Sequence, residues 1–458
     1  MSTSRGSLPP NALRTRLKAR VMGGIASAGA EARRQRRARL GRRLRRAPPA
    51  VRYFHQVDDP YSHLAVQRLD ALAATYAVQV EPWLVPAPAP AFLGDADRHP
   101  AWALADARDI APFHGVEGPG DAGGGRPDPA AVFALAAALA TRPPADFAAA
   151  ALDGGRTLWR GAPAPTPSAS AAAQAERSLR EGARQRARLG HYAGAMFEFD
   201  GDWYWGLDRL PLLEARLRAE GFLRDPGAPL VVPRPQPDAL GDRDARAVRV
   251  ELFPSLRSPY TAVSFPAVQD LMMRTAVAAV LRPVMPMMMR GVAAPRAKQL
   301  YILRDAAREG RRLGVAIGPR PVDPFGEPVR RALSLWKPMH EAGCGMDFIA
   351  EYLRAAWIEG LDVTRDAGLL EVVRRAGAEP ADLVAAVGGH QSDDLLQENL
   401  EAMLGAGLWG VPSFRVSGGG AAPLACWGQD RLWRIETEIA RRARPSGDPQ
   451  PDDRPREE

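Results

Sequence analysis

Apolar residues follow two different periods along the chain. Short β-like runs begin near positions 52 and 250, and after each run a turn leads into a helical stretch. Longer segments place apolar residues three and four positions apart, which predicts amphipathic helices. In the second half these segments are 297–313, 345–359, 369–376, 380–387 and 393–405. The pattern predicts a strand and a helix followed by a long helical insert.

Two further strands are predicted after this insert. Val411-Pro412-Ser413-Phe414-Arg415-Val416 has the composition of a strand that is entered through a Val-Pro turn, and Trp427 is expected on or just after the next strand. The first half has a similar helical insert, which loop-like sequence interrupts at 118–125 and 162–170. This order of elements is typical of an α/β fold of the thioredoxin type with a helical insertion.

The same order of motifs occurs twice. Arg52-Tyr53-Phe54-His55-Gln56-Val57-Asp58-Asp59-Pro60-Tyr61-Ser62 resembles Val250-Glu251-Leu252-Phe253-Pro254-Ser255-Leu256-Arg257-Ser258-Pro259-Tyr260-Thr261. Likewise, Tyr204-Trp205-Gly206-Leu207-Asp208-Arg209-Leu210 resembles Cys426-Trp427-Gly428-Gln429-Asp430-Arg431-Leu432. A single long repeat indicates a duplicated domain and not a solenoid. The predicted parts are a basic arm (1–50), a first domain (51–223), a Pro-rich linker (224–246), a second domain (247–443) and a polar tail (444–458).

The net charge of +8 belongs to the arm, because residues 1–50 hold fourteen Lys and Arg beside one acid, Glu31. The remainder is slightly acidic, so no specific nucleic-acid partner is expected. We interpret the arm as a solvated basic helix or tail outside both domains, with contact to anionic lipid or RNA as the alternative.

Only two cysteines, Cys344 and Cys426, occur in 458 residues. They cannot form a disulfide framework, so a reducing, cytoplasmic location is expected. No apolar stretch is long enough to span a bilayer. The scarcity of lysine, three residues beside 58 arginines, suggests a GC-rich bacterial genome.

Three short motifs carry candidate chemistry. Ser258-Pro259 at a strand-to-helix turn fits a helix N-cap, where a hydroxyl and free backbone N–H groups can also hold an anion such as a thiolate. Val411-Pro412 fits a plain turn or a cis-proline turn that pairs with an extended peptide. Gln429-Asp430 fits a helix cap or a pair that receives an α-amino and an α-carboxylate group.

Together with other segments, these motifs resemble the 2-hydroxychromene-2-carboxylate isomerases, relatives of kappa-class glutathione transferases among the DsbA-like thioredoxin proteins. The resemblance covers about 246–442. The segments that carry it are Ser258-Pro259-Tyr260, Ala297-Lys298 with Tyr301, Leu303, Arg304 and Asp305, Ala356-Trp357 with Glu359-Gly360, Asn399, Gly410-Val411-Pro412-Ser413-Phe414, and Trp427-Gly428-Gln429-Asp430-Arg431-Leu432. The resemblance implies two tandem DsbA-like thioredoxin folds, each with a helical insertion.

The resemblance also implies glutathione as the cofactor and a role for each matching residue. Ser258 would be the catalytic residue that bonds the glutathione sulfur. Val411 and Pro412 would pair with the cysteinyl backbone, and Gln429 and Asp430 would receive the γ-glutamyl end. Ser258 and Thr261 stand where redox relatives have two cysteines, which argues against Cys-x-x-Cys exchange at this site.

The first half departs from this pattern. Asp59 stands in the place of Ser258, and its carboxylate would repel a thiolate. Ala195 is the expected counterpart of Pro412, and Leu207 replaces the glutamine. We expect a degenerate domain that has lost the cofactor. The alternative is a different chemistry, or a metal site, that uses Asp59, His55 and His63, although their spacing fits no standard ligand pattern.

Other residues are candidates for a substrate pocket: Tyr260, Lys298 and Trp427 beside the apolar Met-rich stretch 283–289. No metal ligand set is predicted. The leading hypothesis is a glutathione-dependent isomerase of a small, aromatic-derived substrate. The alternatives are a kappa-type glutathione transferase and a non-catalytic binding or redox-accessory protein. Because such enzymes are commonly homodimers, the two domains of one chain are expected to act as a pseudo-dimer.

Overall fold

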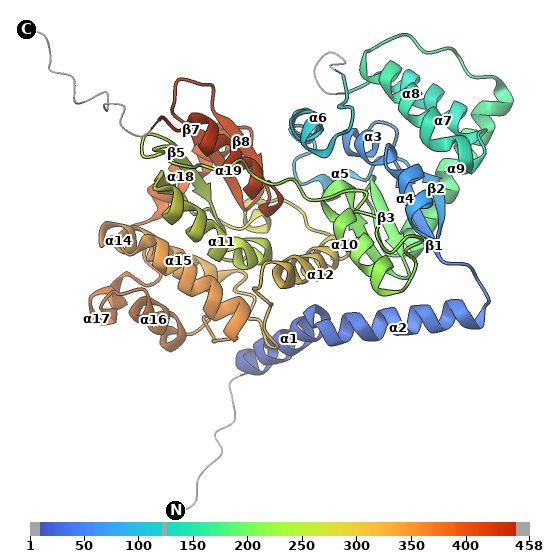
Figure 1. Cartoon of the computed structure of the whole chain (residues 1–458). Coiled ribbons are helices and arrows are strands. Elements are labelled where there is room, and N and C mark those ends of the chain that lie inside the picture. The colour runs from blue at the N-terminus through green and yellow to red at the C-terminus, as the bar shows by residue number, and fades with distance from the viewer. Residues whose placement is uncertain (1–9, 121–125, 446–458) are drawn as a thin grey trace, which may run out of the picture. The chain divides into compact units, whose positions relative to one another are not determined.

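The computed structural model describes residues 10–120 and 126–445 (Figure 1). The chain forms two compact units. The N-terminal unit contains residues 31–235 and 293–301, and the C-terminal unit contains residues up to 30, 236–292 and those from 302 onward. The predicted polar tail (444–458) and loop 118–125 lie largely outside the described residues.

The N-terminal unit is built on a four-stranded sheet in the order β2-β1-β3-β4. β1 (Ala50–His55) pairs in parallel with β2 (Gln79–Leu84) and antiparallel with β3 (Met196–Phe199), which pairs antiparallel with β4 (Asp202–Trp205). The helices are α3 (Pro60–Val66), α4 (Leu69–Thr75), α5 (Pro90–Leu93), α6 (His99–Ile110), α7 (Pro129–Ala140), α8 (Phe147–Trp159), α9 (Ala169–Arg188) and α10 (Gly206–Ala219), with short 3₁₀ turns at Pro112–His114 and Pro144–Asp146.

The C-terminal unit contains a second four-stranded sheet in the equivalent order, β6-β5-β7-β8. β5 (Arg249–Phe253) lies between parallel β6 (Ala278–Leu281) and antiparallel β7 (Ser413–Ser417), and β8 (Leu424–Trp427) completes the sheet. Both predicted strands after the insert are confirmed. Val250 and Leu252 of β5 and Phe414 and Val416 of β7 are fully or almost fully buried in its core.

Helices and helical turns follow the strands of this half of the chain. They are α11 (Pro259–Thr275), η3 (Met287–Arg290), α12 (Arg296–Arg312), α13 (Glu327–Ser334), α14 (Trp336–Glu341), α15 (Gly345–Leu353), η4 (Arg354–Glu359), α16 (Asp366–Arg375), α17 (Pro380–Leu383), η5 (Val384–Ala386), α18 (Asp393–Gly405), η6 (Gln429–Arg431) and α19 (Leu432–Arg442). All five helical segments predicted from periodicity are confirmed. α11 packs against α15 and α19 (Figure 1).

The two units have similar folds, and one side-chain pair marks the same place in each. The Tyr61 hydroxyl donates to Asp106 at 2.7 Å, and the Tyr260 hydroxyl donates to Asp305 at 2.8 Å. Both pairs join the first turn of the helix after the central strand to a residue 45 positions further on. The mixed α/β architecture with two thioredoxin-like sheets agrees with the sequence prediction.

The basic arm is helical, as one of the two alternatives predicted, but the prediction that it lies outside both domains is wrong for residues 10–44. α1 (Pro10–Ala26) packs on the C-terminal unit through small residues, since Ala19 and Ala26 are each 4% exposed. A Cβ atom on Gly23 would lie 1.9 Å from the carbonyl oxygen of Pro319. The small side chains of α1 allow this close approach of the two backbones. Charge and apolar periodicity do not predict such a contact, because it depends on alanine and glycine.

α2 (Ala28–Leu44) packs on the N-terminal unit through its own charges. The buried Arg42 guanidinium pairs with Asp200 and, at 3.6 Å, with Glu220. It also lies over the rings of Phe199 and Phe222, at 5.4 and 5.3 Å from their centroids. Arg42, one of the arginines on which the prediction of a solvated arm rested, therefore anchors α2 to the N-terminal unit.

The predicted linker also makes ordered contacts. Glu214 of α10 accepts hydrogen bonds from the backbone N–H groups of Val231 and Val232, at 2.7 and 2.9 Å. Residues up to 235 thus belong to the N-terminal unit, and those from 236 to the C-terminal unit. Every helix within the described residues is too short or too polar to cross a lipid bilayer.

We predict that Arg42→Ala loosens α2 from the N-terminal unit. The change leaves Asp200 without its buried cation and removes one of the cations paired with Glu220, which costs on the order of 1–3 kcal/mol locally. Limited trypsin digestion should then cut α2 at its remaining arginines at least about tenfold faster. The neighbouring exposed residue provides the control, because Arg43→Ala should leave the cleavage rate near that of the parent protein. Equal rates for both variants would contradict the anchoring role of Arg42.

Candidate functional site

Strand register gathers the predicted site residues of the second half at one edge of the sheet. Phe253, the last residue of β5, pairs with Ser413, the first residue of β7, and Ser413 pairs in turn with Trp427, the last residue of β8. The segments that contain Ser258, Pro412 and Asp430 all adjoin these three paired residues. The structure therefore brings together motifs that lie more than 150 positions apart in sequence.

Ser258 is the N-cap of α11, with the extended backbone angles φ −84° and ψ 118°. Its Oγ accepts a hydrogen bond from the Thr261 N–H at 3.1 Å, and its own N–H donates to the Ser255 carbonyl at 3.0 Å. The side chain is only half-buried. An accessible hydroxyl at the positive end of a 17-residue helix is suited to bind an anion.

The Val411–Pro412 peptide bond is cis. The Gly428 N–H donates to the Pro412 carbonyl at 2.9 Å, which ties this loop to the segment after β8. Gly410 lies against the Trp427 indole, where an added Cβ atom would come within 2.0 Å of the ring. Only glycine fits at this contact, so the loop and the tryptophan set each other's position.

Gln429 and Asp430 lie in η6, directly after Gly428. The buried Gln429 side chain donates from Nε2 to Asp430 Oδ1 at 3.1 Å. Both side chains were candidates for a helix cap or for a ligand site, and in the structure they bond each other. The amide therefore positions the half-buried carboxylate of Asp430, which is the more accessible of the two groups.

Two buried hydroxyls lie near Ser258 at the beginning of α11. Ser255 Oγ and Thr261 Oγ1 belong to side chains that are each 1% exposed, and neither atom has a hydrogen-bond partner among the described residues. Buried polar groups are rarely left without a partner. This edge of the sheet consequently has unused hydrogen-bonding capacity around Ser258.

Arg257, which directly precedes Ser258, is a further residue of this edge that the motifs do not predict. Its guanidinium donates to Asp323 at 2.8 Å and stacks over the Phe325 ring at 4.5 Å. It also lies 3.1 Å from the sulfur of Met288. Its position beside Ser258 is the one sequence feature that points to a role for Arg257. Its partner Asp323 lies in a loop 66 positions away.

A second arginine holds the Met-rich stretch at the same edge. Arg290 donates to the Trp409 carbonyl at 2.8 Å and to the Met285 carbonyl at 3.1 Å. Trp409 in turn packs against Trp427 at 5.0 Å between ring centroids. The contacts of Met288 and Arg290 thus place η3 next to both the Ser258 loop and the Pro412 loop.

The three tentative pocket residues have different surroundings. Tyr260 bonds Asp305 as described above, and Trp427 packs against Gly410 and Trp409. Lys298, however, belongs to the N-terminal unit, where its ammonium donates to the Phe92 carbonyl at 2.8 Å. Burial lowers the pKa of Lys298 to about 8. Of these three, Lys298 is therefore the one that belongs to a different unit from Ser258.

The equivalent edge of the N-terminal unit is closed by its own side chains. Asp59 is the N-cap of α3 and accepts hydrogen bonds from the N–H groups of Tyr61 and Ser62. Ser62 Oγ donates to Asp59 at 2.8 Å and accepts from the N–H groups of Gln56 and Ala195, at 3.2 and 2.9 Å. Ala195 occupies the position of Pro412, as predicted, because the Gly206 N–H donates to its carbonyl at 2.8 Å.

The two histidines that the sequence offers as alternative ligands, His55 and His63, are both buried. His55 bonds the Tyr53 hydroxyl at 3.1 Å, and burial lowers the pKa of His55 to about 3. Burial also lowers the pKa of His63 to about 4, and the ring lies against Gly155. Within residues 10–120 and 126–445, no group of three or more His, Cys, Asp or Glu side chains is arranged to hold a metal ion.

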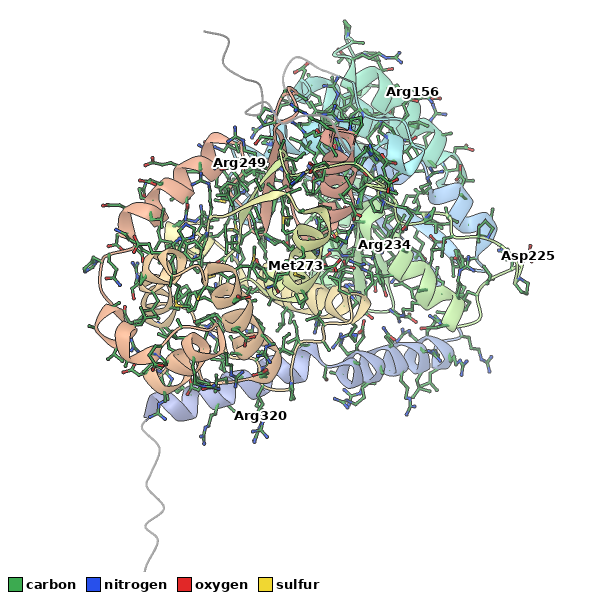
Figure 2. All side chains as sticks on the ribbon, turned by 60° about the vertical axis from the view of Figure 1, so that its left-hand side comes forward. Arg156, Asp225, Arg234, Arg249, Met273 and Arg320 are labelled. Atoms are coloured by element: carbon green, nitrogen blue, oxygen red, sulfur yellow. The ribbon has the colours of Figure 1, made fainter. Side chains whose placement is uncertain are left out.

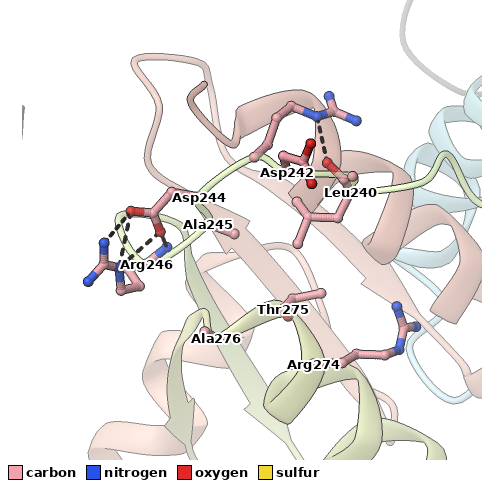
Figure 3. Close-up of a pocket in the computed structure, with 10 residues that line it drawn as sticks. Leu240, Asp242, Asp244, Ala245, Arg246, Arg274, Thr275 and Ala276 are labelled. Atoms are coloured by element: carbon pink, nitrogen blue, oxygen red, sulfur yellow. Dashed lines mark hydrogen bonds and ion pairs between the residues drawn. The ribbon is translucent and has the colours of Figure 1, made fainter. Parts of the chain in front are cut away.

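A separate hollow of about 370 Å³ lies at the other end of α11 (Figure 3). The segment 240–246 and the residues Arg274, Thr275 and Ala276 line it. Asp244 is already paired with Arg246 at 2.7 Å. Since a 17-residue helix is about 25 Å long, this hollow is remote from Ser258.

Comparison with known families identifies the class of the C-terminal unit. Residues 249–440 match the model of the DSBA-like thioredoxin domain, so this part of the chain is a DsbA-like thioredoxin domain. No curated protein in the comparison matches the chain.

Three solved structures illustrate what this chain is similar to. A 2-hydroxychromene-2-carboxylate isomerase is 16% identical, with a TM-score of 0.36, over 42% of this chain and 95% of that chain. The cytosolic disulfide reductase DsbM from Pseudomonas aeruginosa is 18% identical, with a TM-score of 0.33, over 42% and 98%. The oxidoreductase DsbA from Xylella fastidiosa is 15% identical, with a TM-score of 0.28, over 45% and 90%.

We predict a pH-dependent stability that originates from Asp59. Burial raises the pKa of this carboxyl from 3.8 to about 7. Its protonation therefore stabilises the fold fully below pH 3.8, and this stabilisation is lost as the pH rises to about 7. Asp59→Asn keeps a capping side chain without the charge. The unfolding free energy of this variant minus that of the parent should therefore increase by about 1–2 kcal/mol between pH 5.5 and 7 and then level off.

Urea denaturation followed by hydrogen exchange in peptides from β1 and β3 would measure this difference for the N-terminal unit. Asp70→Asn, at an exposed position of α4, is the matched control and should track the parent at every pH. A constant difference between Asp59→Asn and the parent would show that Asp59 is ionised in the folded protein across this range.

Proposed function

We propose that the C-terminal unit binds glutathione and catalyses a glutathione-dependent isomerisation of a conjugated carbonyl compound. The observation that carries the proposal is the half-buried Ser258 hydroxyl at the N-terminus of α11, at the same edge of the sheet as the Pro412 loop and Asp430. In this proposal the chain is a tandem pair of DsbA-like domains, of which only the second keeps the cofactor residues.

Ser258 has the chemistry that a bound thiolate needs. Its Oγ already accepts one hydrogen bond from Thr261, so the hydroxyl proton can be donated to a sulfur anion. The positive end of the helix dipole stabilises the same charge. Both effects lower the pKa of the thiol and raise the fraction of nucleophilic thiolate at neutral pH.

The remaining residues would position the tripeptide. We assign the cysteinyl backbone of glutathione to Val411 and Pro412, and the γ-glutamyl ammonium to the carboxylate of Asp430. The Gln429 amide holds that carboxylate in place from the protein side. The buried Ser255 and Thr261 hydroxyls offer further hydrogen bonds, directly or through water.

The proposed reaction consumes no glutathione. The thiolate adds to the β-carbon of the conjugated carbonyl, so that a C–S bond forms and the C=C π electrons move to the carbonyl oxygen as an enolate. The former double bond then rotates as a single bond. Collapse of the enolate expels the thiolate and restores the C=C bond in the new geometry. The protein contributes thiolate stabilisation and positioning.

An apolar, flat substrate fits the surroundings that η3 provides. Met288 lies against Arg257, and Arg290 ties the same segment to the Trp409 carbonyl. Methionine side chains adapt to aromatic surfaces. The Arg257 guanidinium beside Ser258 would supply a positive charge for a substrate carboxylate, although it is shared with Asp323.

Two other functions use the same residues. A kappa-type glutathione transferase would stop after C–S bond formation and release the conjugate. A non-catalytic protein would bind glutathione or an extended peptide without turning it over. The accessible Ser258 hydroxyl favours the enzymes, because binding alone needs no group that stabilises a thiolate.

We expect calorimetric titration to give a millimolar or tighter dissociation constant for glutathione on the full chain. Asp430→Ala should weaken binding by about tenfold or more, because it removes a charged partner. Ser258→Ala should change the affinity less but raise the pKa of the bound thiol, which thiolate absorbance near 240 nm measures as a function of pH.

Ser417→Ala, at the far end of β7, is the control and should leave both quantities unchanged. If the parent binds no glutathione at millimolar concentration, the cofactor assignment is wrong. If it binds glutathione but neither isomerises nor conjugates an arylidene keto acid, the non-catalytic alternative holds.

A further inference from the structure

α2 presents two opposite faces, and only one of them is used within the N-terminal unit. On the inner face, charged and polar side chains pair with carboxylates of that unit. These pairs are Arg34 and Gln35 with Asp202, Arg39 with Glu220, and Arg42 with Asp200 and Glu220. This face fixes how the helix is rotated about its axis.

The outer face follows from the helical period of about 100° per residue. Four arginines and two leucines fall within about one third of the circumference, opposite the inner face. They are Arg33, Arg36, Arg37, Leu40, Arg43 and Leu44, and all six are exposed. Figure 2 draws the side chains of this helix, which is blue in Figure 1.

Neither the charges nor the leucines of this outer face are explained by contacts in the chain. Among the described residues, none of the four arginines has a carboxylate within ion-pair distance. Leu40 and Leu44 are 56% and 76% exposed, one helical turn apart in the same row. The single acid of α2, Glu31, falls on the inner side of the helix.

We propose that this outer face, defined by these six residues, docks on the surface of an anionic lipid bilayer. Guanidinium groups are attracted to lipid phosphates, and leucines one turn apart can enter the boundary between headgroups and acyl chains. The two leucines decide against nucleic acid, because a phosphate backbone would bind the arginines and leave both apolar side chains in water.

The small number of residues in the outer face limits the strength of the association with lipid. Two leucines and four arginines give a peripheral, reversible association that depends on anionic lipid and weakens as salt screens the charges. The inner face keeps α2 attached to the N-terminal unit while the outer face is in contact with lipid. This proposal does not depend on glutathione binding.

Sedimentation of the full chain with vesicles tests the proposal. We expect binding to phosphatidylcholine vesicles that contain phosphatidylserine, little binding to phosphatidylcholine alone, and loss of binding in high salt. Replacing Leu40 and Leu44 together by serine should lower the partition coefficient about tenfold or more. Replacing Arg33, Arg36, Arg37 and Arg43 together by alanine should lower it at least as much.

The control removes the same charge elsewhere in the N-terminal unit. Alanine at Arg177, Arg180, Arg184 and Arg188, all exposed on α9, should leave vesicle binding within about twofold of the parent. Circular dichroism of each variant checks that the fold is intact. Three results would overturn the proposal: no sedimentation with phosphatidylserine at low salt, equal loss in the α9 variant, or vesicle binding that does not depend on the leucines. If the protein also retains a single-stranded RNA, and neither RNA binding nor vesicle binding changes in the Leu40 and Leu44 variant, the face binds nucleic acid instead.

Discussion

The pairing of β5 with β7 is the constraint on which the candidate site depends. Because Phe253 pairs with Ser413 and Ser413 with Trp427, the chain leaves or enters all three strands at one edge, and Ser258, Pro412 and Asp430 follow within a few residues. A slip of one residue would turn the buried Phe414 and Val416 towards the opposite face. The burial of these side chains in the core therefore also fixes the relative positions of Ser258, Pro412 and Asp430.

The two units share this constraint but satisfy it with different chemistry. In the N-terminal unit, the Ser62 hydroxyl bonds Asp59 and the backbone N–H groups of Gln56 and Ala195. In the C-terminal unit, proline removes one backbone donor, serine replaces the carboxylate, and the Ser255 and Thr261 hydroxyls have no partner among the described residues. The Ser62 hydroxyl at the first edge is therefore satisfied by the protein itself, whereas two hydroxyls at the second edge are not satisfied by the described residues. The unequal chemistry of the two halves is thus visible in their hydrogen bonds as well as in their motifs.

Sequence reasoning succeeded where local patterns specify the structure. The strand Ser413–Ser417 and the helix Asp393–Gly405 follow from periodicity, and the equivalence of Ala195 with Pro412 follows from the repeat. It failed where long-range contacts decide. Arg257 is held by Asp323 and Phe325, and no pattern in the neighbouring sequence predicts these contacts. Lys298 lies in a helix that was correctly predicted, but its ammonium bonds Phe92, 206 positions away.

The basic arm shows why net charge alone misjudges such a segment. α2 carries its arginines on both faces, and the two sets have different electrostatic surroundings. The inner set neutralises Asp200, Asp202 and Glu220 and is part of the fold. The outer set has no such partners within the described residues, so its charge remains available to a surface outside the protein. Charge that is paired by folding contributes little to long-range attraction, so within α2 the outer arginines, beside Leu40 and Leu44, carry the charge that can act on a surface outside the protein.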